Sequence, residues 1–352
     1  MLQKWQKAKI SSKMIIILFI FLLFSYPFVK NSKIYTQKNN YEKMREAAKL
    51  MEEMSDYTYK LRKEKGFDIN EKIDPLKTGL IGKEFTEITT TTGDLEAKQT
   101  ALNPDFAGLL VDYFANDLNL KKGDRVAVGA SGSFPGFMLA VTSAGEVLEL
   151  DLKIVYSLGA SNYGANIVGF TMADILPELN ENNFISYNIN GLSLGGGSDI
   201  GQGMYLNPRE LKGKYENEFE NFIYEKELKQ NMKMRREIFQ GDGKEPAVFV
   251  NIGGNVINYG RTYPDNGLML SGDDFNNAKS MIEFYLDKEI PVINLINIKD
   301  LAEKHGIKKA PRNISDTGEA SFYYKNLYRR ILAVLILATY TLLLIYFKRK
   351  EG

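Results

Sequence analysis

Four short loops rich in glycine and serine are the best candidates for a functional site. Gly129-Ala130-Ser131 and Gly159-Ala160-Ser161 repeat one tripeptide after two predicted strands, and Gly195-Gly196-Gly197-Ser198-Asp199 and Gly253-Gly254-Asn255 follow two more. Glycine lets backbone amides approach a ligand closely, and clustered amides favour an anion. These loops therefore predict a site for a carboxylate or phosphate, although tight turns that need a positive φ use the same residues.

The predicted ligand-binding residues come from these loops, their surroundings and a preceding threonine run. They are Thr91, Thr92, Ser131, Gly132, Ser133, Ser161, Asn162, Asn166, Gly195, Gly196, Gly197, Asp199, Gly253, Gly254 and Asn255. Right-handed crossovers place the loops after parallel strands at the same edge of a sheet. We therefore expect them to face one cleft.

Ser131, Ser133 and Lys98 are the candidate catalytic residues. The serines begin a predicted helix, as in the nucleophile elbow of hydrolases, but the closing glycine of that motif is missing. The single histidine, His305, lies beside a helix-ending glycine among lysines, which is typical of a surface residue. A serine or threonine activated by a buried lysine stays open. Residues 129–136 lack the Gly-Lys-Ser/Thr of a P-loop.

The composition excludes several classes of protein and site. The chain has 352 residues, no cysteine and one histidine, which excludes disulfides, thiolate zinc sites and cysteine nucleophiles. Lys+Arg 45 against Asp+Glu 44 does not fit a polybasic nucleic-acid binder, and 44% hydrophobic residues exclude disorder. Asp94, Glu96, Asp105 and Asp199 could bind a divalent cation, but acidic neighbours are common here. We predict no metal site and no cofactor.

The elements that must position these loops alternate between strand and helix. The predicted strands are Arg125–Val128, Lys153–Leu158, Ile185–Ile189, Ala247–Ile252 and Pro291–Leu295. The predicted helices between and around them are residues 104–122, Phe137–Leu148, 208–239, Phe275–Leu286 and Lys299–His305. This alternation predicts an α/β domain over residues 73–325, with a mostly parallel sheet, helices on both faces and a Rossmann-like class.

An amphipathic helix is predicted between about Tyr41 and Lys65, within a segment, residues 30–72, that we interpret as a helical stalk. Met44, Ala47, Met51, Met54 and Leu61 recur at three- and four-residue steps. The helix could self-associate through this seam or pack on the globular body. Only about three heptads fit, which favours packing on the body.

Two apolar segments, residues 14–29 and 330–347, predict transmembrane helices near the two ends of the chain. Their uncharged runs are Met14–Val29 and Ile331–Phe347. Lysines precede the first run, and Lys348-Arg349-Lys350 follows the second. Aromatic residues suited to an interfacial belt flank the second run: Tyr323, Tyr324, Tyr328, Tyr346 and Phe347. A cleaved signal peptide is the alternative for the first run, but Ser25-Tyr26-Pro27-Phe28 suits a signal peptidase poorly. A buried core helix is the alternative for the second.

Two spans put both termini on one side of the membrane. The positive-inside rule assigns residues 1–13 and the tail, residues 348–352, to the cytoplasm. The main domain is then extracytoplasmic, and the protein is expected in the cell membrane.

Several of these motifs together resemble the bacterial poly-gamma-glutamate system protein family, an accessory component found with the capsule synthase. The resemblance covers roughly residues 80–260. It is carried by Thr89–Thr100, Asn103–Ala107, Gly129–Pro135, Gly159–Asn166 and Ser193–Gly203. It implies a membrane-associated role in making, exporting or retaining poly-gamma-glutamate, with the polymer and the synthase membrane subunits as partners, and implies no catalytic residue. The alternatives are an extracytoplasmic Ser- or Thr-dependent hydrolase or transferase acting on the polymer, and a structural adaptor.

Overall fold

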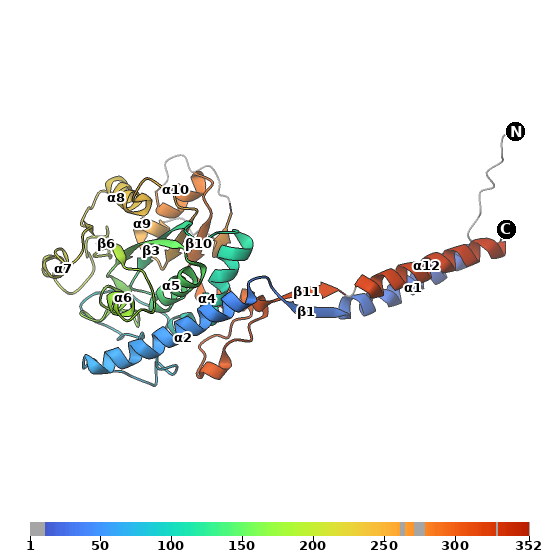
Figure 1. The fold of residues 1–352 in the computed structure, drawn as a ribbon, viewed down its shortest axis with the longest axis horizontal. Coiled ribbons are helices and arrows are strands. Elements are labelled where there is room, and N and C mark those ends of the chain that lie inside the picture. The colour runs from blue at the N-terminus through green and yellow to red at the C-terminus, as the bar shows by residue number, and fades with distance from the viewer. Residues whose placement is uncertain (1–10, 261–264, 271–278, 329, 352) are drawn as a thin grey trace. The chain divides into compact units, whose positions relative to one another are not determined.

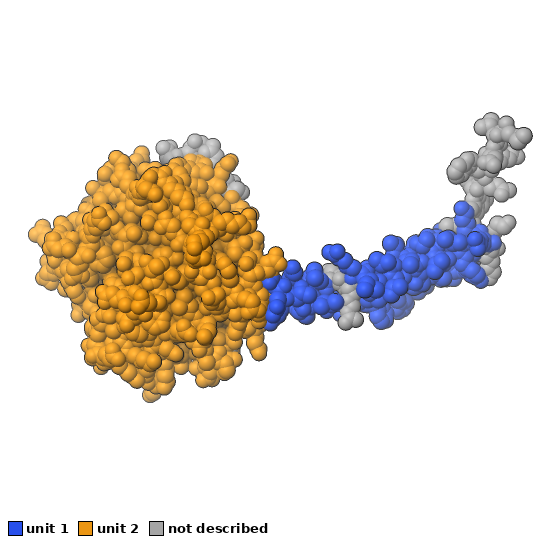
Figure 2. Space-filling view, viewed as in Figure 1, with its two compact units in different colours: residues 1–38, 324–352 blue, residues 39–323 orange. Residues whose placement is uncertain are grey.

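The computed structural model describes residues 11–260, 265–270, 279–328 and 330–351, which form two compact units (Figures 1 and 2). We call Met1–Lys38 with Tyr324–Gly352 the terminal unit, and Asn39–Tyr323 the body.

The terminal unit contains two apolar helices, α1 (Ser12–Asn31) and α12 (Arg330–Glu351), which contact each other. Strands β1 (Lys33–Gln37) and β11 (Tyr324–Tyr328) pair antiparallel beside them. Both helices are long and apolar enough to cross a membrane, and only 11% and 0% of the two candidate spans are buried. The core helix of a soluble protein would be mostly buried, and neither span is. A signal sequence near the N-terminus can be as long and as apolar as α1.

The body is built on a seven-stranded sheet. Its order is β7 (Phe222–Ile223), β6 (Ile189–Ser193), β4 (Asp151–Ser157), β3 (Arg125–Ser131), β8 (Val248–Ile252), β10 (Val292–Leu295) and β9 (Gly267–Met269). All neighbours are parallel except β9, which runs antiparallel to β10. The mixed α/β fold with a mostly parallel sheet is confirmed.

Helices cover the sheet on both faces (Figure 1). On one face, α5 (Pro135–Leu148) packs on β4 and is itself almost completely buried. On the other face, α8 (Leu228–Gln240), α9 (Val256–Tyr259) and α10 (Met281–Asp287) enclose a core that includes Phe239, Phe249 and Tyr285. Strands β3 and β8 are buried throughout, which explains the apolar runs Val126–Val128 and Val248–Val250 within them.

Helix α2 (Tyr41–Glu64) packs on the body rather than extending from it as a stalk. Its apolar face contacts α4 (Asp105–Val111) and α5, and Met44, Met51 and Met54 are fully buried. This is the packing that the amphipathic pattern favours. The segment 30–72 is therefore not one element, because β1 belongs to the terminal unit and α2 to the body.

The remaining elements are short. They are α3 (Leu95–Ala101), a π-helical turn (Asp112–Asp117), α6 (Met172–Glu181), α7 (Pro208–Tyr215), α11 (Ile298–His305), and 3₁₀ turns at Ile314–Asp316 and Ser321–Tyr323. Strand β2 (Thr89–Thr91) forms a separate two-stranded sheet with β5 (Ala160–Ser161).

Four predicted elements differ most from the structure in their bounds. The helix predicted over residues 104–122 is α4 followed by the π-helical turn, which ends at Asp117. The strand predicted at Ile185–Ile189 is β6, four residues later. Ile185 and Tyr187 are buried like strand residues, but they lie in the irregular segment before β6. The helix predicted over 208–239 is two helices, since Glu227 accepts amide hydrogen bonds from Lys229 and Gln230 and so caps a new helix.

The helix predicted from Phe275 has its described part in α10, where the Ser280 side chain caps the first turn, and residues 275–278 lie outside the described residues.

Tyr323 is not an interfacial residue. Its ring is fully buried in the body, and its hydroxyl donates to Asp105 Oδ1 at 2.9 Å.

Candidate functional site

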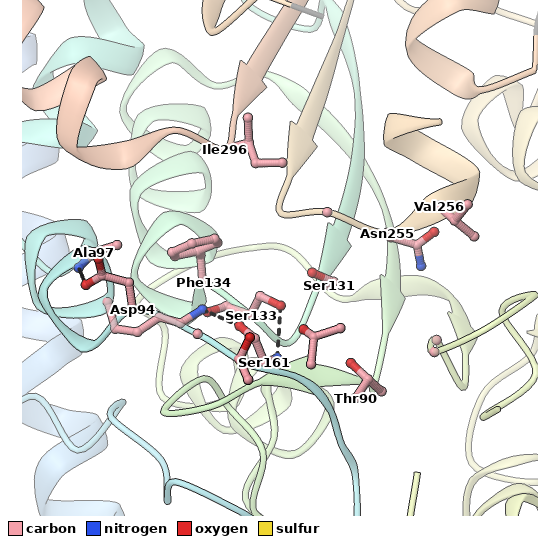
Figure 3. Close-up of a pocket in the computed structure, with 18 of the residues that line it drawn as sticks. Thr90, Asp94, Ala97, Ser131, Ser133, Phe134, Ser161, Asn255, Val256 and Ile296 are labelled. Carbon is pink, nitrogen blue, oxygen red and sulfur yellow. Dashed lines mark hydrogen bonds between the residues drawn. The ribbon is translucent and has the colours of Figure 1, made fainter. Parts of the chain in front are cut away.

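A cavity of about 730 Å³ lies at the carboxyl edge of the large sheet (Figure 3). The loops that follow β3, β4, β6, β8 and β10 all contribute to its wall. The strand order reverses beside β3, since β4 and β6 extend to one side and β8 and β10 to the other. Open parallel sheets form their ligand crevice at such a reversal.

Most of the predicted site residues line this cavity. They are Thr91, Thr92, Lys98, Ser131, Ser133, Ser161, Gly195, Gly196, Gly197, Gly254 and Asn255. The structure thus brings all four glycine-serine loops and the threonine run together. In Figure 3, Phe134, Ser133 and Ser161 lie grouped together, and Asn255 and Val256 lie across the view from them.

Five predicted residues do not line the cavity: Gly132, Asn162, Asn166, Asp199 and Gly253. Asn166 instead forms hydrogen bonds that hold the segment from Lys83 to Thr89 in place. It accepts from the Lys83 amide at 3.0 Å and donates to the Lys83 carbonyl at 2.8 Å and the Thr89 hydroxyl at 3.0 Å. Asn162 is buried, and the orientation of its amide that satisfies its hydrogen bonds lets its nitrogen donate to the Thr91 carbonyl at 2.8 Å. These amide groups position loops rather than a ligand.

Asp199 lies behind the cavity in a fully buried ion pair. Its carboxylate accepts from Arg235 Nη2 at 2.6 Å, with both side chains completely inaccessible to solvent. The other carboxylate oxygen accepts from Asn255 Nδ2 at 3.0 Å. Asp199 therefore orients Asn255, which does line the cavity, and closes the glycine-rich loop after β6.

The glycines of the loops serve two different purposes. A Cβ at Gly132 would lie 2.8 Å from the Leu158 carbonyl oxygen, and one at Gly196, where φ is +68°, would lie 2.6 Å from the Gln202 carbonyl oxygen. Those two glycines are required by the backbone packing. A Cβ at Gly254 would meet only the Ile296 side chain, at 3.8 Å. Gly254 therefore leaves open space in the cavity wall.

Lys98 carries the buried amine of the site. Only 3% of the residue is exposed, and its ammonium group contacts the Ser133 carbonyl and lies 2.6 Å from Ser161 Oγ. The Nζ atom also sits 3.7 Å from the centre of the Phe134 ring. Burial lowers the pKa of Lys98 to about 7, and the nearby Asp94 only partly opposes this shift.

The hydroxyls of Ser131 and Ser133, the two predicted nucleophiles, have other partners. Ser133 Oγ accepts from the Ser161 amide at 3.1 Å, and Ser131 Oγ lies 3.4 Å from the Ile252 carbonyl oxygen on β8. The serine whose hydroxyl contacts Lys98 is Ser161, which was predicted as a ligand-binding residue and not as a nucleophile.

Part of the cavity wall was not predicted as ligand-binding residues. Thr90, Gly159 and Ser198 belong to the threonine run and the predicted loops, and the other such residues are Gly93, Asp94, Ala97, Phe134, Gln202, Val256, Ile296, Asn297, Ile298 and Lys299. Residues 296–299 could have been found, because they follow the predicted strand ending at Leu295 and so belong to the same sheet edge.

The acidic residues considered as cation ligands have separate partners. Asp94 and Glu96 pair with Lys299, at 2.6 and 3.3 Å, and Asp105 accepts from the Gly318 amide and Tyr323. Among the residues that the structure describes, no three His, Cys, Asp or Glu side chains gather in a way that could hold a metal ion. His305 lies away from the cavity lining, with its Nε2 2.8 Å from the Tyr113 hydroxyl.

Comparison with known protein families, with curated proteins and with solved structures finds no match to this chain.

Proposed function

We propose that the chain is a membrane-anchored accessory protein of poly-gamma-glutamate biosynthesis or export, and that its body binds the polymer in the cavity at the sheet edge. The observation that carries the proposal is the convergence of five strand-end loops on one cavity lined by glycine backbone, hydroxyl and amide groups. Such groups offer hydrogen bonds to the carboxylates and amides of a repeating chain. The sequence resemblance supports the choice of polymer.

The electrostatics of the cavity suit a carboxylate held at one place rather than along a basic trough. Lys98 and Lys299 are the lysines of the lining, and Lys299 is already paired with Asp94. Helix α5 begins at Pro135, directly after the lining residues Ser133 and Phe134, so its positive amino end adds to the field there. One carboxylate at the amino end of α5 would fit this balance.

The same proposal includes the anchor and the fold class. Helices α1 and α12 would hold the protein in the cell membrane with the body on the extracytoplasmic side, and their exposed apolar faces would contact the membrane subunits of the synthase. The strand order, with its reversal beside β3, supports a Rossmann-like class.

Filling the cavity at Gly254 tests polymer binding directly. The full chain, reconstituted in nanodiscs of neutral lipid, is titrated against fluorescent poly-gamma-glutamate, with neutral dextran as the comparison polymer. We expect Gly254→Leu to weaken binding at least about tenfold, because its side chain enters open space that the polymer would occupy.

The matched control is Gly213→Leu, on the exposed side of α7, where a Cβ meets nothing within 4 Å. It should bind like the wild-type chain. Equal binding by the two variants, or no binding of the polymer by the wild-type chain, would contradict the proposal.

A further inference from the structure

A lysine and a serine side chain meet in the wall of the cavity, 63 residues apart in the sequence. Lys98 Nζ lies 2.6 Å from Ser161 Oγ, and both residues line the cavity although each is less than a tenth exposed. A hydroxyl in contact with an amine that can lose its proton is the arrangement that activates a serine for attack on an acyl group.

We propose that Lys98 and Ser161 form a catalytic pair for acyl transfer, with Ser161 as the nucleophile and Lys98 as its general base, acting on an amide whose acyl group carries a carboxylate. The carboxylate of the substrate rests on the function proposed above. The catalytic pair does not depend on that function, because it rests on the contact between the two side chains.

Neighbouring elements hold the two groups in place. The backbone of Ser161 is fixed by the pairing of β5 with β2, and its amide donates to Ser133 Oγ at 3.1 Å. The Lys98 ammonium group is fixed by the Ser133 carbonyl and by the face of the Phe134 ring. Positioning of this kind contributes to catalysis because the reacting atoms need no further ordering. Ser133 and Phe134 are thus positioning residues.

Gly93 keeps the Ser161 hydroxyl accessible. A Cβ at position 93 would lie 3.0 Å from Ser161 Oγ and 2.7 Å from the Asn162 carbonyl oxygen. Any side chain at this position would cover the hydroxyl from the threonine-run side, whereas glycine leaves it facing the cavity.

The charges around Lys98 suit a base near neutral pH. Burial holds the pKa of Lys98 at about 7, so a large fraction of its amine is unprotonated at pH 7.5. The other charged groups of the cavity lining are Asp94 and Lys299, which pair with each other, and Glu96 also pairs with Lys299. Because these opposite charges are paired, Asp94 raises the pKa of Lys98 less than an unpaired carboxylate would.

The chemical step balances without a cofactor. Ser161 Oγ gives its proton to Lys98 Nζ and forms a bond to the acyl carbon, and the tetrahedral intermediate then expels the amine, which takes the proton from Nζ. Water, activated by the same lysine, attacks the resulting ester and restores the serine. The net reaction converts amide and water into acid and amine, and an amine in place of water gives transfer instead.

The test uses the full chain in detergent micelles and two probes. A fluorophosphonate marks an activated serine, because its phosphorus bonds to Oγ as fluoride leaves, and peptide mass spectrometry locates the label. Gamma-glutamyl-p-nitroanilide reports amide cleavage through released p-nitroaniline. We expect labelling on Ser161, with a rate that rises with pH through about 7.

Three variants accompany the wild-type chain, each checked for folding by its thermal midpoint. Ser161→Ala should abolish labelling and cleavage, and Lys98→Met should lower both rates by about 10²–10⁴-fold, the usual contribution of a general base. Ser143→Ala removes a buried serine hydroxyl of α5 that lies outside the cavity lining, and should change neither rate.

The outcomes separate this proposal from the binding proposal. No labelling of the wild-type chain, a label on another residue, or unchanged rates in Lys98→Met would overturn the catalytic pair and make Lys98 a structural link between loops. Poly-gamma-glutamate would still bind to Ser161→Ala if the binding proposal holds. Labelling at Ser161 without any polymer binding would keep the catalytic pair and overturn the function proposed above.

Discussion

At the scale of single residues, Lys98 is the group whose burial has the clearest energetic consequence. Its pKa in the folded chain is about 7, whereas an unfolded lysine has a pKa near 10.4. Between these values the unfolded chain holds a proton that the folded chain lacks. Stability therefore rises as pH increases through this window and is lowest below pH 7.

We predict that replacing Lys98 by methionine flattens this pH dependence. From pH 7 to 9.5 the wild-type chain should gain roughly 3 kcal/mol of stability from Lys98, whereas Lys98→Met should gain none of it. The measurement is the thermal midpoint of the full chain in detergent at several pH values. Lys233→Met, at an exposed position on α8, is the control and should behave like the wild type. A wild-type midpoint that is flat across this window would refute the prediction.

The Asp199–Arg235 pair should be a strong determinant of stability, because neither side chain reaches solvent. Asp199→Asn keeps the shape and tolerates the left-handed backbone at this position, where φ is +62°, but leaves a buried guanidinium without its counter-charge. We expect a loss of about 3–5 kcal/mol in the free energy of unfolding.

The exposed pair Lys233–Glu237 provides the contrast for that prediction. Glu237→Gln, on the same helix α8, should cost less than about 1 kcal/mol. Equal losses of unfolding free energy for Asp199→Asn and Glu237→Gln would show that the buried pair stabilises the fold no more than an exposed pair does.

At the scale of elements, the close approach of α5 to the end of α3 depends on one glycine. A Cβ at Gly136 would lie 2.3 Å from the Ala101 carbonyl oxygen, so Gly136→Ala must push the two helices apart. We predict a loss of about 1–3 kcal/mol, the usual cost of overpacking. Gly213→Ala, in α7 where a Cβ has open space, should instead stabilise by about 0.5–1 kcal/mol. Thermal midpoints shifted in the same direction by both variants would contradict this prediction.

The same elements show what the sequence could and could not predict. Alternating apolar segments predicted β3, β4, β8 and β10 closely, because buried parallel strands read as continuous apolar runs. The shift of β6 and the break before α8 were not predicted, because they depend on packing and on capping by Glu227, which no local apolar pattern reveals.

The candidate site could also be predicted only in part from the sequence. Loops that follow parallel strands must share one edge, so their convergence could be inferred from the strand pattern. The contact of Lys98 with Ser161 could not be inferred, because it depends on the pairing of two very short strands, β2 and β5. The partner of Asp199 could not be inferred either, because Arg235 lies on α8, 36 residues further along the chain.

At the scale of the whole molecule, the absence of cysteine makes the membrane topology directly measurable. If α1 and α12 both cross the membrane, the two chain ends lie on one side and residues 39–323 on the other, because the body joins the two spans. The basic residues at both ends favour the cytoplasm for the ends. Because the wild-type chain contains no cysteine, a single introduced cysteine has no competing thiol. Tyr205, which is 82% exposed in a loop of the body, is a suitable position.

We predict that Tyr205→Cys reacts with a membrane-impermeant maleimide in intact cells, whereas Gly352→Cys reacts only after the membrane is permeabilised. The physical reason is that the reagent reaches only thiols on the outer side of the cytoplasmic membrane, and the wild-type chain offers none on either side. Cleavage of the first span as a signal sequence would leave this labelling pattern unchanged but shorten the chain, which mass measurement of the purified protein detects. Protection of Tyr205→Cys until permeabilisation would place the body in the cytoplasm and remove its access to an exported polymer. Labelling of both Tyr205→Cys and Gly352→Cys in intact cells would instead show that α12 does not return the chain to the cytoplasm.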